Sequence, residues 1–64
     1  MSLRCLIVDD EPLARRGLRH RLALLEGLEV VAEASNGREA LAAIAEHTPD
    51  LTLLDIQLPG VDRL

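Results

Sequence analysis

The chain contains no phenylalanine, tyrosine or tryptophan. Base-stacking surfaces and aromatic ligand pockets are therefore excluded, because both are built from such rings. The chain also contains no lysine, and its single cysteine, Cys5, excludes a disulfide within the chain. One cysteine without an internal partner fits a reducing compartment, so we expect a cytoplasmic protein.

Charge and hydropathy narrow the possible partners further. Seven arginines stand against eleven acidic residues, and the net charge of −4 disfavours nucleic acid as the partner of this chain. No apolar run is long enough to span a bilayer, and the start, Met1–Leu3, carries no basic signal-peptide region, so we expect no membrane association. The 64 residues allow one domain at most, with a marginal core.

Apolar runs separated by turn signals predict five elements. Pro12 suits the first position of a helix, Gly27 suits a helix end, and Asn36 followed by Glu39 resembles a capping box. We expect strands at 3–8, 28–34 and 51–54, helices at 12–25 and from Asn36 to Pro49, and a loop at 56–64. The expected apolar stripes are Leu13, Ala14, Leu18, Leu22, Leu24 and Leu25 in the first helix, and Ala40, Leu41, Ile44 and Ala45 in the second.

This order of elements predicts an α/β fold with a parallel three-stranded sheet and right-handed crossovers. The third strand is apolar throughout, which favours the middle of a sheet, whereas the second alternates, which favours an edge. The more polar face of the second strand carries Glu29, Val31 and Glu33, and its apolar face carries Val30, Ala32 and Ala34. Strand order 2-1-3 satisfies both preferences and places the two helices on opposite faces of the sheet.

Acidic side chains gather where the first and third strands end. Asp9, Asp10 and Glu11 follow the first strand, and Asp55 follows the third. In an open α/β sheet, ligands bind beyond the carboxyl ends of the strands where the winding direction reverses, which here lies between these two strands. Carboxylates this close repel one another unless a cation joins them, and oxygen ligands suit Mg²⁺ or Ca²⁺ better than zinc. The residues therefore predict a hard-cation site beside a carboxylate.

Three segments resemble one known family, the response-regulator receiver domains of two-component signal transduction. They are residues 6–15 (LIVDDEPLAR), 36–41 (NGREAL) and 53–62 (LLDIQLPGVD), in the order and spacing of that family. The resemblance covers essentially the whole chain and is closest to the AlgR/LytR branch, whose full-length members also carry a DNA-binding domain. It implies that residues 1–64 form the N-terminal half of a flavodoxin-like receiver domain.

The resemblance also implies a role for each residue of the acidic end. Asp55 would accept a phosphoryl group from a sensor histidine kinase, and Mg²⁺ would be held by Asp10, by Asp55 and by the backbone carbonyl of Gln57. Asp9 would support the site, partly through water. The chain would then be a phosphoacceptor signalling domain and not an enzyme, with self-catalysed phosphoryl transfer at most. It would reach DNA only through an output domain that the 64 residues do not contain.

Two departures from the family pattern weaken this expectation. Asp62 is followed by Arg63, where the family usually has glycine. More seriously, receivers hold the phosphoryl oxygens with a hydroxyl from their fourth strand and a lysine from their fifth, and these 64 residues include neither strand and no lysine. We therefore expect phosphorylation of this chain to be impaired.

Simpler interpretations of the same residues stay open. The acidic run at residues 9–11 is also typical of a helix N-terminus, and the arginines of residues 15–21 are also typical of a solvated helix face. Glycine-rich nucleotide-binding motifs are missing, and Gln57 stands where an aspartate-nucleophile phosphatase needs a second aspartate. The main alternative is a non-catalytic dimerisation or interaction module of receiver ancestry. In it, residues 51–54 would present an unpaired apolar edge through which two copies form a homodimer.

Overall fold

A computed structural model describes residues 2–55, with the exception of the side chain of Asp55. Its elements are β1 (Leu3–Asp9), α1 (Pro12–Leu22), β2 (Leu28–Ala34), α2 (Gly37–His47) and β3 (Leu51–Asp55). The predicted α/β order is confirmed. The loop predicted at residues 56–64, which includes Gln57, lies outside the described residues.

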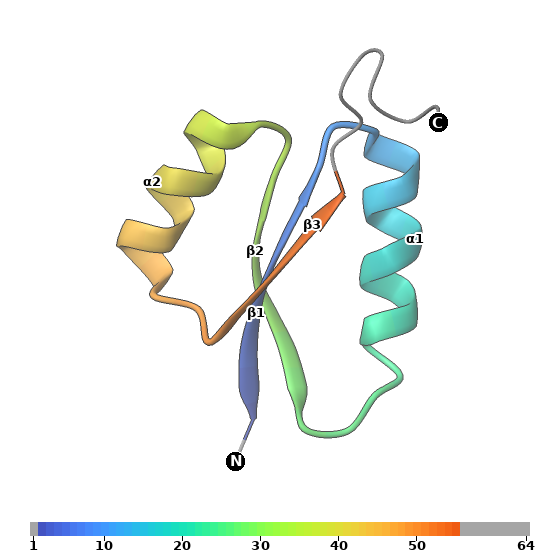
Figure 1. Cartoon of the computed structure of the whole chain (residues 1–64). Helices are drawn as coiled ribbons and strands as arrows, with labels where there is room; N and C mark the ends of the chain where they lie inside the picture. Colours follow the sequence, from blue (N-terminus) through green and yellow to red (C-terminus); the bar gives the residue numbers. More distant parts are fainter. Residues whose placement is uncertain (1, 56–64) are drawn as a thin grey trace, which may run out of the picture.

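The three strands form one parallel sheet in the order β2-β1-β3. Helices α1 and α2 cover opposite faces of this sheet (Figure 1), as the crossover rule requires. Both the strand order and the placement of the helices are therefore as predicted, but among residues 2–55 the middle strand is β1, and the apolar β3, which was expected in the middle, lies at an edge. Among residues 2–55, neither helix has the length and apolar content that crossing a bilayer requires.

The core is built on β1, which is the middle strand of the three. Its side chains from Cys5 to Val8 are all fully buried. Successive residues of a strand face opposite sides, so Leu6 and Val8 pack towards α2, against Ala34 and Ala40. On the other side, Cys5 and Ile7 pack towards α1, against Leu22. One strand therefore supplies both halves of the core, and its carboxyl end follows directly from this buried segment between the two helices.

A bulge in β2 overturns the predicted alternation of that strand. Cys5 pairs with Val30 but the next residue of β1, Leu6, pairs with Ala32, so Val31 is an extra residue. Val30 consequently packs on the α1 side of the sheet and Ala32 on the α2 side. The prediction that these two residues share a face is wrong, because one inserted residue reverses the facing of everything that follows it.

Helix α1 is shorter than predicted, ending at Leu22 instead of residue 25. The N–H groups of Leu24 and Leu25 donate to carbonyls three residues back, which tightens the chain into turns. Gly27 does not cap the helix; its φ of +83° and its carbonyl serve the turn into β2, where the carbonyl accepts from the N–H of Leu3. Three leucines of the predicted stripe are largely exposed: Leu13, Leu24 and Leu25.

Helix α2 begins and ends as predicted. The side chain of Asn36 accepts a hydrogen bond from the N–H of Glu39 at 2.9 Å, which satisfies one of the free donors of the first turn. The helix ends before Thr48, which has a left-handed φ of 43°, and Pro49 follows. Of the predicted stripe, Ala40 is buried but Leu41 is 71% exposed, because α2 meets β2 and β1 through its small residues.

Candidate functional site

The ends of β1 and β3 lie side by side at one edge of the sheet. Asp9 is the last residue of β1 and pairs in register with Asp55, the last residue of β3. Asp10 and Glu11 then lead directly into α1 at Pro12. The sequence prediction that these strand ends are adjacent is therefore confirmed for the backbone, and the edge is the one at which open parallel sheets bind ligands.

Asp9 is a buried acidic residue, with only 3% of its surface exposed. Its Oδ1 accepts a hydrogen bond from the N–H of Glu11 at 2.9 Å, which closes a tight turn directly after the strand. This turn directs the chain from β1 into α1. Asp9 therefore stabilises the conformation of the loop through this hydrogen bond, in addition to contributing a negative charge.

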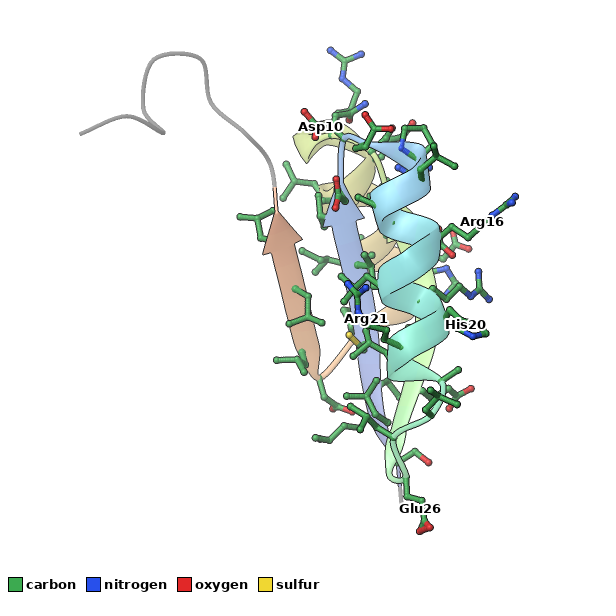
Figure 2. All side chains as sticks on the ribbon, turned by 90° about the vertical axis from the view of Figure 1, so that its right-hand side faces the viewer. Asp10, Arg16, His20, Arg21 and Glu26 are labelled. Carbon is green, nitrogen blue, oxygen red and sulfur yellow. The ribbon has the colours of Figure 1, made fainter. Side chains whose placement is uncertain are left out.

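Asp10 and Glu11 are exposed, and Asp10 lies in the turn between β1 and α1 (Figure 2). Glu11 occupies the N-cap position of α1, but its side chain makes no capping hydrogen bond, and the first turn of the helix contains no acidic residue. The Glu11 side chain therefore contributes no hydrogen bond to the cap of α1. The simpler interpretation of residues 9–11 as acidic charges favoured by the helix dipole needs no such hydrogen bond, so it stays open beside the metal-site prediction.

The structure describes only some of the residues that are predicted to bind metal. Among the described side chains, no group of three histidine, cysteine, aspartate or glutamate residues is close enough to hold an ion. Asp9 and Asp10 are at the expected edge, whereas the side chain of Asp55 and all of Gln57 fall outside the description. The predicted ligand set thus stays a prediction, and its oxygen-only chemistry suits a hard cation such as Mg²⁺.

Two arginines of α1 pair with Glu33 of β2, which sequence reasoning missed. Arg15 Nε lies 3.1 Å from Glu33 Oε1, and Arg19 Nη1 donates to Glu33 Oε2. Arg15 Nη1 also donates to the backbone carbonyl of Asp9 at 2.6 Å. The prediction of a solvated helix face holds for Arg16, which projects away from the molecule with His20 (Figure 2), but not for Arg15, whose side chain is only 20% exposed.

The start of α2 lies at the same edge of the sheet, because it follows the end of β2. Glu39 Oε1 accepts from the N–H and from the hydroxyl of Ser35 at 2.8 and 2.7 Å. The backbone hydrogen bond from Ser35 is the main reason that the pKa of Glu39 lies below its ordinary value, with the Ser35 hydroxyl and the charge of Arg15 acting in the same direction. One half of the predicted capping box thus forms, from the Glu39 N–H to Asn36, whereas the Glu39 side chain reaches Ser35, the residue before the N-cap.

Cys5 is a core residue and is not part of the acidic end of the sheet. It lies in the α1 side of the core, and burial raises the pKa of its thiol above the ordinary value. A thiol held in its protonated form is a poor nucleophile, so the structure supports the prediction that Cys5 is a small core residue.

Comparison with known proteins identifies the family. The sequence profile described as "Response regulator receiver domain" matches residues 5–63, and the chain belongs to this family. The structure resembles the signal receiver domain of NarL from Mycobacterium tuberculosis with a TM-score of 0.81 and 43% sequence identity. The match covers 95% of this chain and 49% of that domain. The predicted family is thereby confirmed.

Several relatives share about half of their aligned residues with this chain. A response regulatory protein of Yersinia pestis is 52% identical over 62 residues, covering 97% of this chain and 26% of that protein. The positive alginate biosynthesis regulatory protein of Pseudomonas aeruginosa is 53% identical over 60 residues, covering 92% of this chain and 24% of that protein. A protein-glutamate methylesterase of Myxococcus xanthus is 48% identical, covering 97% of this chain and 18% of that protein. The chain thus spans a quarter or less of most of these proteins, and the part it spans is their receiver region.

Proposed function

We propose that this chain is the phosphoacceptor part of a response regulator, in which Asp55 receives a phosphoryl group from a sensor histidine kinase. The observation that carries this proposal is the register pairing of Asp9 with Asp55, which brings the acidic end of β1 beside the acceptor position. Family membership supports it independently.

The proposed transfer is a direct displacement at phosphorus. A carboxylate oxygen of Asp55 attacks the phosphoryl group of a phosphohistidine, the P–N bond breaks, and the imidazole leaves with the electron pair. The product is an aspartyl phosphate on this chain. Electrostatic stabilisation matters most in such a step, because charge spreads over the phosphoryl oxygens.

Asp10, Asp55 and the carbonyl of Gln57 would hold Mg²⁺, with Asp9 in support. Bound Mg²⁺ would neutralise negative charge on the phosphoryl oxygens. The exposed carboxylate of Asp10 suits a direct ligand, whereas the buried Asp9, whose Oδ1 already accepts from the Glu11 N–H, suits a supporting one. Few protein ligands imply millimolar affinity, or about −4 kcal/mol.

We further propose that residues 1–64 correspond to the N-terminal half of a receiver domain, in line with their coverage of 49% of the NarL receiver. Transfer onto this chain alone should then be slow, because it contains no lysine to contact the phosphoryl oxygens. Each lost contact of that kind costs about 3 kcal/mol in the transition state. Any DNA binding would belong to an output domain, since this chain carries a net charge of −4.

The test is phosphorylation with a small phosphodonor in the presence of Mg²⁺, read by intact mass. We expect a small amount of adduct on the 64-residue chain and much more after fusion to the second half of a receiver. Asp55→Asn should abolish both. An adduct that survives Asp55→Asn would refute the acceptor assignment, and rapid stoichiometric labelling of the 64 residues alone would refute the proposed impairment.

A second candidate function is homodimerisation through β3. It is favoured by the exposure of Leu54, at 68%, and of Leu51, at 37%. Among residues 2–55, no strand pairs with the outer edge of β3, and apolar strand edges of this kind recruit further strands. Sedimentation equilibrium distinguishes the candidates: a folded monomer at micromolar concentration would exclude the dimer and leave the phosphoacceptor proposal untouched.

A further inference from the structure

Arg15 is the residue that ties the acidic loop to the rest of the fold. Its backbone N–H donates to the carbonyl of Glu11 at 2.9 Å, which fixes its Cα in the first turn of α1. From there its side chain reaches two acceptors at once, the carbonyl of Asp9 at 2.6 Å and Glu33 Oε1 at 3.1 Å. The planar guanidinium presents its donors in a fixed fork, so it can hold both acceptors in one geometry.

The carbonyl that Arg15 holds belongs to the peptide group between Asp9 and Asp10. A peptide group is planar, so fixing this oxygen fixes the plane from which the Cα of Asp10 departs. The other fixed point of the loop is the hydrogen bond from the Glu11 N–H to Asp9 Oδ1. Together these two hydrogen bonds constrain the backbone on either side of Asp10, and thereby the point at the end of β1 from which its exposed carboxylate projects.

Glu33 reaches Arg15 because of the bulge in β2. The extra residue Val31 reverses the facing of the strand, so Val30 and Glu33, which are an odd number of positions apart, both face α1. Glu33 also pairs with Arg19, one helical turn further along α1. Its carboxylate is thus held between two guanidinium groups and gives Arg15 a fixed support.

We propose that Arg15 is a positioning residue for the cation site: it orients the Asp9–Asp10 peptide group so that Asp10 is set for Mg²⁺. This inference rests on the proposed function. Attraction of the cation cannot explain Arg15, because a guanidinium repels Mg²⁺. The positioning effect must therefore be tested with a substitution that keeps the charge.

The test compares Arg15→Lys with Arg19→Lys. Both variants keep the net charge, and both weaken one ion pair to Glu33, but only Arg15 donates to the carbonyl of Asp9. A lysine ammonium is a compact charge without the planar fork, so it cannot reproduce both hydrogen bonds of Arg15. Circular dichroism establishes that each variant retains the fold.

The first measurement is amide hydrogen exchange of Glu11 in the metal-free protein, followed by NMR. We expect exchange at this N–H to accelerate several-fold in Arg15→Lys and to stay unchanged in Arg19→Lys. The second is titration with Mg²⁺. The dissociation constant for Mg²⁺ should rise about tenfold in Arg15→Lys and by less than about twofold in Arg19→Lys. A tenfold change is the low end of what residues that orient metal ligands contribute to metal affinity.

Equal effects of the two substitutions would overturn the inference, because they would reduce Arg15 to an ordinary surface ion pair. If the wild-type chain gives no Mg²⁺ response at all, the proposed metal site fails, while exchange at Glu11 still decides whether Arg15 orders the loop. Should Arg15→Lys not fold, the scalar coupling across the hydrogen bond from the Arg15 guanidinium to the Asp9 carbonyl, measured in the wild type, decides instead. Absence of that coupling would overturn the proposal.

Discussion

Leu53 and Leu54 are neighbours on β3 with opposite surroundings, so lysine substitutions at the two positions should differ strongly in their effect on stability. Leu53 is partly buried and packs against the cluster of Cys5, Ile7 and Leu22. The side chain of Leu54 is 68% exposed. Leu53→Lys therefore removes packing from the α1 side of the sheet and brings a charge towards it, whereas Leu54→Lys places the same charge in water.

The expected difference follows from burial. Truncation of a buried leucine costs about 2–5 kcal/mol, and the partial burial of Leu53 places Leu53→Lys near the lower limit, at about 2 kcal/mol. Leu54→Lys should change the free energy of unfolding by no more than about 0.5 kcal/mol. A chain of this length has roughly 3–10 kcal/mol in total. With a slope of about 1 kcal/mol per molar urea, the midpoint should fall by about 2 M in Leu53→Lys only.

Urea titration followed by far-UV circular dichroism is the appropriate assay, because the chain has no tryptophan or tyrosine for fluorescence. Equal midpoints for the two variants would refute the packing in which Leu53 contributes to the α1 side of the core. The same pair tests association. Leu54→Lys should dissociate a dimer paired through β3 while leaving the protomer folded, so an unchanged dimer in this variant would place the contact elsewhere.

Further predictions concern the acidic loop and the start of α2. Asp10→Asn should weaken Mg²⁺ binding about tenfold, because the charge of the ligands sets the affinity of such sites, whereas Glu11→Gln, the matched control of equal charge change, should weaken it much less; identical NMR titrations would show that Asp10 is not a ligand. Asn36→Ala should cost about 1 kcal/mol of stability in thermal unfolding, since it removes the acceptor for the Glu39 N–H. The lowered pKa of Glu39, caused mainly by the backbone N–H of Ser35, stabilises the fold above the ordinary carboxyl pKa, and this contribution is lost as pH falls through the lowered value. Glu39→Gln should therefore flatten the acid side of the stability profile; a profile identical to that of the wild type would contradict this assignment.

The order of elements was predictable because each is specified locally. Pro12 at the start of α1, Asn36 at the cap of α2 and the apolar run of β1 are signals that need no knowledge of the rest of the chain. The strand order followed from crossover handedness, which is equally general. Errors occurred where the packing between elements decides the outcome. The length of α1 was overestimated because Leu24 and Leu25 continue the apolar stripe, although none of the elements described in residues 2–55 covers them.

The candidate site was predictable to the extent that it depends on strand ends. Parallel strands carry their carboxyl ends to one edge, so the adjacency of Asp9 and Asp55 needed only the strand order and a reasonable register. The ligand set of the cation came from family resemblance instead, because geometry alone does not say which of several neighbouring carboxylates binds. That part still depends on the proposed experiments, with Asp10 and Asp55 as the decisive residues.

The contacts of Arg15 show a limit of periodicity as a guide to function. A helical wheel places Arg15 and Arg16 together on a polar face, and it treats both as solvated. A wheel contains no information on the extra residue of β2, Val31, which turns Glu33 towards α1. Because Glu33 faces α1, Arg15 can link β2 to the carbonyl of Asp9. The bulge therefore connects an irregularity in one strand to the loop at the end of another, through a single side chain. If this link orders the acidic loop, deletion of Val31 should disturb that loop although the deleted residue lies outside it.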